Sequence, residues 1–207
     1  MNFDAEALRR QIPYYLTAPP AQKQLLTELK ALSRGASKGH FFPENSDQFN
    51  EHSLQGDGWA GFQAFSFKDQ ALQNLRGIVL SNSCDIAPDN KRDTPPRISF
   101  APLLRLAKLE SRFQDRGLSQ EGIESRLSAI RAQSVTSLFY LPKDGPLEHE
   151  SVVLLDDMHS MPVDVFRTTG KKLFTLSMAG FYLFVFKLSV HLCRLQEDVD
   201  RSSPGSN

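Results

Sequence analysis

Ser151-Val152-Val153-Leu154-Leu155-Asp156 is the stretch that decides the fold class, because its run of branched apolar residues favours a buried strand. A second run of this kind, Gly77-Ile78-Val79-Leu80-Ser81, is bounded by turn formers. Further strands are expected at 59–67, 98–104 and 137–141. The last of these precedes a long loop and would pair with the first stretch as a hairpin.

Helical patterns lie on both sides of these strands and interrupt them once. Residues 4–34 favour a helix in two pieces that prolines separate, and 178–200 favour an amphipathic helix. The interruption, at about 104–133, has Ser119 as its expected N-cap before one apolar face. The simplest organisation is an α+β protein, in which helices at both ends flank a small β-barrel core with one helical insertion.

The composition fits a globular protein and excludes several classes. In 207 residues, 24 Lys and Arg balance 24 Asp and Glu, which argues against a strongly basic nucleic-acid binder but leaves a local basic patch open. The two cysteines, Cys84 and Cys193, are too far apart for a metal-ligand pair and exclude a disulfide-stapled scaffold. We therefore expect no metal and no cofactor.

The sequence also predicts no contact with a membrane. The apolar stretch at 173–190 is interrupted by Lys187, and its dense part is shorter than a spanning helix requires. The first residues lack the apolar run of a signal peptide, which together with the unpaired thiols places the protein in the cytoplasm.

The order of three segments along the chain is more informative than any single motif within them. They are Gln55-Gly56-Asp57-Gly58-Trp59, then LRGIVLS at 75–81, then SVVLLDDMHS at 151–160, with ISFAPL at 98–103 between the last two. In this order they resemble the MazF/PemK-like toxins of bacterial toxin–antitoxin systems. That family opens with G-D-x-[WY], continues with R-P-x-L-V-L-S and a short strand ending in an apolar-Pro-[IL]-Thr pattern, and closes with S-V-[IV]-L-x-D-Q-[IL]-R-[ST].

The resemblance implies an SH3-like barrel, a C-terminal helix, often a homodimer, and cleavage of single-stranded RNA. Arg76 matches the family's Arg that assists cleavage, and Asp156 matches an Asp that can contribute. The family's Thr falls at Leu104, its proline at Gly77, and the Arg of its turn at His159. Acid–base cleavage needs groups that exchange protons, and Leu104 cannot. The resemblance therefore implies a divergent member with impaired catalysis.

The expected parts are an N-terminal helical extension at 1–53, a MazF/PemK-like barrel domain at 54–201 with its insertion at about 104–133, and a frayed tail at 202–207. The first functional hypothesis is a toxin–antitoxin or defence-associated protein that binds RNA, an antitoxin-like protein or another protein partner. The second is an active single-strand-specific endoribonuclease, with Arg76 as phosphate clamp and Asp156 or His159 as acid or base. The third is a hydrolase that depends on Cys84.

Each candidate site also has a structural interpretation. Cys84 is either part of a strand-end turn or a nucleophile, which would need a base or positive charge such as His159 or Arg76. Asp57 either accepts backbone N–H bonds in a turn, the favoured reading, or lies beside a binding groove. Trp59 and Asp85 are further candidate binding residues.

Two other sites leave alternatives open. Arg76 either binds a phosphate or carboxylate, or makes a surface ion pair. Asp156, Asp157 and His159 form either a divalent-metal site or, as favoured, a solvated strand end, because adjacent strand residues point to opposite faces.

Overall fold

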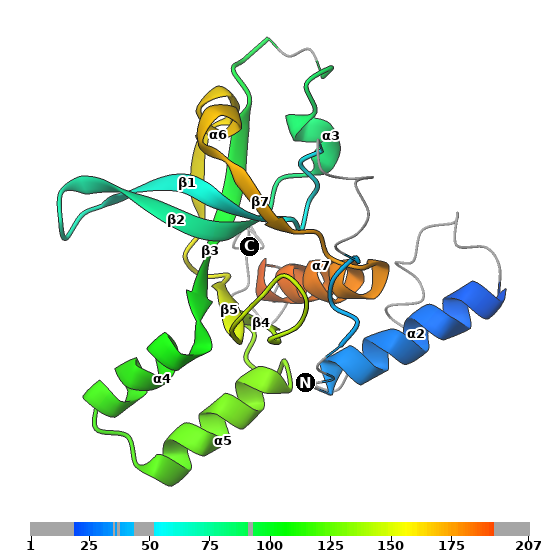
Figure 1. Ribbon diagram of the computed structural model, residues 1–207, viewed down its shortest axis with the longest axis vertical. Helices are drawn as coiled ribbons and strands as arrows, with labels where there is room; N and C mark the ends of the chain where they lie inside the picture. Colours follow the sequence, from blue (N-terminus) through cyan, green and yellow to red (C-terminus); the bar gives the residue numbers. More distant parts are fainter. Residues whose placement is uncertain (1–18, 35, 37, 44–51, 91–92, 193–207) are drawn as a thin grey trace, which may run out of the picture.

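The computed structural model describes residues 19–34, 36, 38–43, 52–90 and 93–192 (Figure 1). The helices are α2 (Pro19–Ser33), α3 (Ser83–Ile86), α4 (Leu106–Asp115), α5 (Gln120–Arg131), α6 (Val163–Thr169) and α7 (Met178–Leu192). The strands are β1 (Gly58–Ser66), β2 (Ala71–Val79), β3 (Arg97–Arg105), β4 (Leu138–Leu141), β5 (Ser151–Leu154), β6 (His159–Pro162) and β7 (Lys171–Phe174). The helix expected before residue 19, Cys193, the end of the C-terminal helix and the tail at 202–207 lie outside the described residues.

The seven strands form one antiparallel sheet that does not close on itself. Its order is β4-β5-β3-β2-β1-β7, and β6 pairs with β3 off this path. β3 is the central strand because successive parts of it pair with β6, β2 and β5. The expected α+β class is confirmed.

Two glycines shape the middle of this sheet. Gly61 has φ of +91° and produces a β-bulge between Ala60 and Phe62, where a side chain would collide with the carbonyl of Thr169. Gly77 is buried, and a Cβ atom there would lie 2.7 Å from the carbonyl oxygen of Ala101 on β3. Glycine therefore stands where the resemblance expects proline because β2 and β3 approach each other closely.

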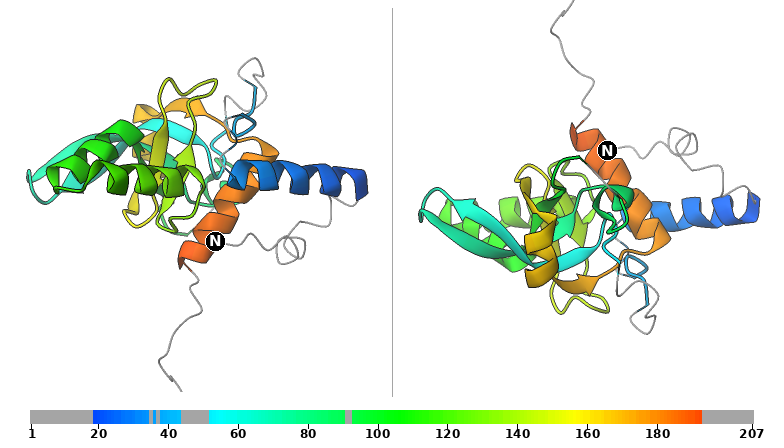
Figure 2. Two further views of the ribbon diagram at one scale, coloured as in Figure 1. Left: turned by 90° about the horizontal axis from the view of Figure 1, so that it is seen from below. Right: turned by 90° about the horizontal axis from the view of Figure 1, so that it is seen from above.

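Apolar side chains cover both faces of the sheet. On one face α7 packs against α2, and Leu29, Ile78 and Phe184 are fully buried between the helices and the strands (Figure 2). On the other face α6 contributes Phe166, whose ring stacks on Phe62 at 5.1 Å. The apolar stretch that raised the question of a membrane therefore begins in β7 and continues into α7, which packs against the body of the protein.

A third apolar cluster lies under the insertion. Ile123, Leu127 and Ile130 of α5 are buried against β4 and β5 in the same cluster as Leu106 of α4. The helical character expected at about 104–133 is observed as two helices, α4 and α5. The N-cap prediction is confirmed, since the hydroxyl of Ser119 accepts the Gly122 N–H at 3.2 Å.

Two arms extend from this body to the same side. One is the β1–β2 hairpin and the other is the α4–α5 pair, and the views in Figures 1 and 2 agree on this arrangement. The outer half of the hairpin pairs only within itself, because β7 reaches no further along β1 than Ala60 and β3 no further along β2 than Gly77. The candidate site lies where the two arms leave the sheet.

Candidate functional site

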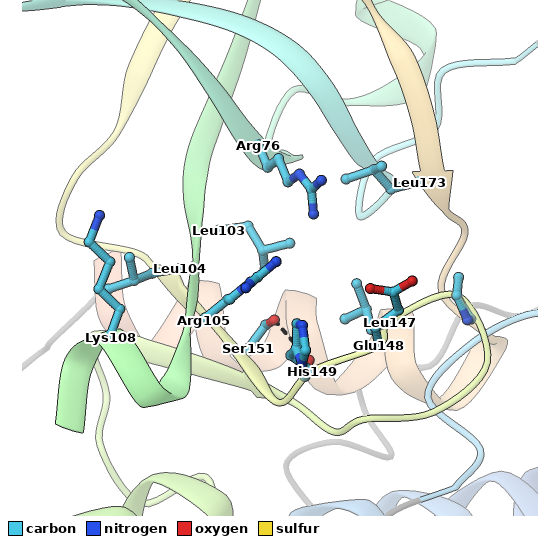
Figure 3. A pocket seen from close by; sticks show the side chains of 11 residues that line it. Arg76, Leu103, Leu104, Arg105, Lys108, Leu147, Glu148, His149, Ser151 and Leu173 are labelled. Carbon is cyan, nitrogen blue, oxygen red and sulfur yellow. Dashed lines mark hydrogen bonds between the residues drawn. The ribbon is translucent and has the colours of Figure 1, made fainter. Parts of the chain in front are cut away.

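A cavity of about 500 Å³ lies between β2, the end of β3, α4 and the loop that joins β4 to β5 (Figure 3). We call it the Arg76 cavity. Its lining residues are Arg76, Leu103, Leu104, Arg105, Lys108, Pro146, Leu147, Glu148, His149, Ser151 and Leu173.

Strand alternation places Arg76 in this cavity. Arg76 and Ile78 lie on one face of β2 because strand residues two apart share a face, and Ile78 is buried in the core against α7. β3 ends at Arg105 and α4 begins at the next residue, which brings Lys108 to the rim. The β4–β5 loop closes the cavity because Ser151 pairs with Arg105 at the strand ends.

The cavity carries an excess of unpaired positive charge. Arg76, Arg105 and Lys108 are exposed, and none of their side chains makes a hydrogen bond or ion pair with another described residue. Arg76 and Arg105 both point into the cavity, and Glu148 is its single carboxylate (Figure 3). Guanidinium groups without a side-chain partner can offer several N–H donors to one anion. Phosphate and carboxylate are the anions whose geometry fits a guanidinium group.

Arg76 and Leu104, the two positions that the resemblance gives to cleavage, line the same cavity. Leu104 is half-buried and packs against the cluster under the insertion. The one hydroxyl among the lining residues, that of Ser151, donates to the carbonyl of His149 at 3.0 Å. The lining thus holds two side chains of the kinds that serve as general acids and bases, His149 and Glu148.

The sequence reasoning missed four of the charged lining residues, namely Arg105, Lys108, Glu148 and His149. The two acid–base candidates come from a loop whose sequence has no pattern. The basic pair did carry a signal, because Arg105, Lys108 and Arg112 follow the 3–4 spacing of one helix face.

The structure does not bring Asp156 or His159 into the Arg76 cavity. Asp156 follows the end of β5 rather than lying in a strand, because the Asp157 N–H donates to the carbonyl of Leu154 at 3.2 Å and closes a turn. His159 begins β6, where its Nε2 lies 3.0 Å from Oδ1 of Asp157 and its ring stacks on Phe100. Both aspartates are exposed, which fits the solvated strand end. Among the described residues, no three His, Cys, Asp or Glu side chains gather as metal ligands.

Asp57 has a structural role in the turn before β1. Its buried carboxylate accepts the Leu54 N–H at 2.8 Å, and its Oδ2 lies 2.8 Å from Nζ of Lys172 on β7. Burial raises the pKa of Asp57, while the bonds from Lys172 and Leu54 oppose that rise. Lys172 also lies over the ring of Trp59, 5.5 Å from its centroid. The favoured interpretation of Asp57, a turn that accepts a backbone N–H, is confirmed.

Cys84 lies in a second cavity, of about 490 Å³, that Trp59, His52 and Arg167 also line. Arg76 and His159, the partners expected for its thiol, do not line this cavity. Arg76 lines the Arg76 cavity, and His159 lines neither of the two. The short helix α3 holds Cys84, whose backbone N–H donates to the Asn82 side chain at 3.0 Å, as a strand-end turn predicts. The thiol is exposed and has no hydrogen-bond partner in the described part of the chain. Asp85 is exposed in the same helix and does not line the cavity.

No described helix is long and apolar enough to cross a membrane. In comparisons with known proteins, no family model matches this sequence, and no curated protein matches it.

Proposed function

We propose that this chain is a divergent MazF/PemK-like barrel protein that binds single-stranded RNA through the Arg76 cavity and lacks the family's cleavage chemistry. The observation that carries the proposal is that Arg76 and Leu104, the two positions that the resemblance gives to cleavage, line the same cavity.

The charges of the cavity support a polyanionic ligand. The whole chain is neutral, so attraction for RNA has to come from a local excess of positive charge. Arg76, Arg105 and Lys108 supply that excess without a carboxylate partner among the described residues. Binding of phosphates by such groups releases counterions, and affinity should fall steeply with added salt.

The absence of cleavage follows from the residue at the expected threonine position. Leu104 offers no proton donor or acceptor to a reacting phosphodiester. A second candidate function, an active endoribonuclease, is favoured by one observation: His149 and Glu148 reach the same cavity and could exchange protons there. In that case the acid and base would come from the β4–β5 loop rather than from Asp156 or His159.

One experiment separates binding from cleavage. The full chain is incubated with a fluorescently labelled single strand of RNA of about 12 nucleotides. Anisotropy then reports binding, and the length of the recovered strand reports cleavage. We expect binding without shortening, and an affinity about tenfold lower for Arg76→Ala, because a charge-assisted hydrogen bond is lost.

Arg34→Ala is the matched control, because Arg34 is exposed beyond the end of α2 and lines neither the Arg76 cavity nor that of Cys84. Equal affinities for Arg76→Ala and Arg34→Ala would refute the proposed binding site. Shortening of the strand that disappears in His149→Ala would replace the binding function with the endoribonuclease.

A further inference from the structure

The tip of the β1–β2 hairpin exposes three large apolar side chains. Phe67 is 88% exposed, Leu72 68% and Phe65 48%. The rings of Phe65 and Phe67 meet edge to face, with centroids 5.3 Å apart, so that they form one aromatic surface. The turn beneath them is held by its own hydrogen bonds, from the Ser66 hydroxyl and the Gln73 side chain to Asp69. The tip is therefore an ordered apolar patch rather than a loose loop.

This patch lies on the same face of the hairpin as Arg76. Leu72, Asn74 and Arg76 alternate along one face of β2, and Phe65 is the direct cross-strand partner of Leu72. Leu75, on the opposite face, packs against the cluster on the α6 side of the sheet. Arg76 lies four positions along β2 from Leu72 at the tip, a distance of about 13 Å.

The second arm adds positive charge on the side of the cavity. Arg105, Lys108, Arg112 and Arg116 recur every three or four residues from the end of β3 along α4, so they follow one stripe of the helix. All four are exposed, and none pairs with a carboxylate in the described part of the chain. Both arms extend from the body of the protein to the same side (Figures 1 and 2).

We propose that the aromatic hairpin tip, Phe65 with Phe67, is a stacking platform for an unpaired base of the nucleic-acid strand whose phosphates the Arg76 cavity and the α4 stripe bind. This inference rests on the proposed function and extends it to a second contact on the same ligand. Surfaces that bind single-stranded nucleic acids combine a positively charged groove with aromatic side chains, because every base has a face that can stack on an aromatic ring. A protein partner is the less favoured occupant because the patch is small and continues into unpaired positive charge rather than into further apolar surface.

The test compares strands that reach the tip with strands that do not. Affinities of the full chain are measured for a dinucleotide and for RNA and DNA single strands of about 12 nucleotides. The variants are Phe65→Ser with Phe67→Ser, Arg76→Ala, and Val165→Ser, which removes an exposed apolar side chain from α6. The thermal midpoint of each variant is recorded to confirm that it folds. Both phenylalanine rings are exposed, so we expect their replacement to leave the fold intact.

We expect the double phenylalanine variant to bind both long strands about 5- to 150-fold more weakly, the range for one stacked base, and the dinucleotide as tightly as before. The salt dependence should stay unchanged because no charge is removed, whereas Arg76→Ala should reduce its slope by about one. In a separate variant, Phe67→Trp, the long strands should quench the new indole fluorescence and the dinucleotide should not.

The outcomes separate this inference from the function on which it rests. Weaker binding by Arg76→Ala with no change in the double phenylalanine variant would overturn the platform and leave the proposed function intact. If the unmodified chain binds no strand, both fail. A loss confined to RNA would point to the ribose rather than the base and would overturn stacking.

Discussion

Lys187 is a buried cation on α7, and its replacement tests how the C-terminal helix is held. Its side chain is only 2% exposed, and its Nζ donates to the backbone oxygen and to Oε1 of Gln133, at 2.8 and 2.9 Å. Gln133 follows α5 and in turn exchanges bonds with the backbone of Tyr140 on β4. Lys187 therefore joins α7 to the insertion and to the sheet.

Burial lowers the pKa of Lys187 from 10.5 to about 7. The unfolded chain thus keeps a proton between pH 7 and 10.5 that the folded chain has released, so stability rises with pH across this window. With about 1.4 kcal/mol per pKa unit, the free energy of unfolding should gain about 2 kcal/mol between pH 7 and pH 9 from this group alone. Lys187→Met keeps an unbranched side chain one atom shorter and removes the titrating group.

Urea unfolding of both proteins at pH 7, 8 and 9 measures this gain. The difference in the free energy of unfolding, unmodified chain minus Lys187→Met, should increase by about 2 kcal/mol over that range. A difference that stays constant with pH would refute the reasoning, because it would mean that the two oxygens of Gln133 keep Lys187 charged in the folded protein.

Three further predictions concern other buried groups. Burial lowers the pKa of His40 from 6.5 to about 4, so the stability that its neutral ring contributes above pH 6.5 should be lost, by up to about 3 kcal/mol, as the pH falls to 4. The difference in unfolding free energy between the unmodified chain and His40→Leu over that range checks this. Tyr140→Phe removes a 2.6 Å hydrogen bond to Glu150 and should cost about 1 kcal/mol in urea unfolding at pH 7. Gly77→Ala should cost about 1–3 kcal/mol by forcing β2 away from β3, which a lower thermal midpoint would reveal and an unchanged one would contradict.

The elements that the sequence predicted well are those with a strong local signal. The branched runs became β5 and the inner half of β2, and the apolar periodicity after Ser119 became α5. The outer half of β2, with the sequence ALQN, is a strand because β1 pairs with it, and no local pattern indicates that.

Two short elements, β6 and α6, could not be predicted from local patterns. β6 contains Met161 and Pro162 and no alternation, and its pairing with β3 defines it. α6 has the sequence VDVFRTT, whose branched residues favour strands, yet it is a helix that buries Phe166 against the sheet. Tertiary packing outweighs local preference in both.

The candidate site was predicted in part for the same reason. The ordered motifs located Arg76 and Leu104, since each lies in a strand that the sequence shows. Glu148 and His149 come from a loop that reaches the cavity only because β4 and β5 pair. The grouping of Asp156 and His159 with Arg76 failed because a turn separates β5 from β6 and directs both residues elsewhere.

The most direct test of the account is the salt dependence of RNA binding. The affinity of the full chain for a single strand of about 12 nucleotides is measured at several salt concentrations, with Arg76→Ala beside it and Arg34→Ala as control. We expect a steep fall in affinity with salt, a slope reduced by about one in Arg76→Ala, and an unchanged slope in the control. Binding that does not depend on salt, or a slope that Arg76→Ala leaves unaltered, would contradict RNA binding through the Arg76 cavity.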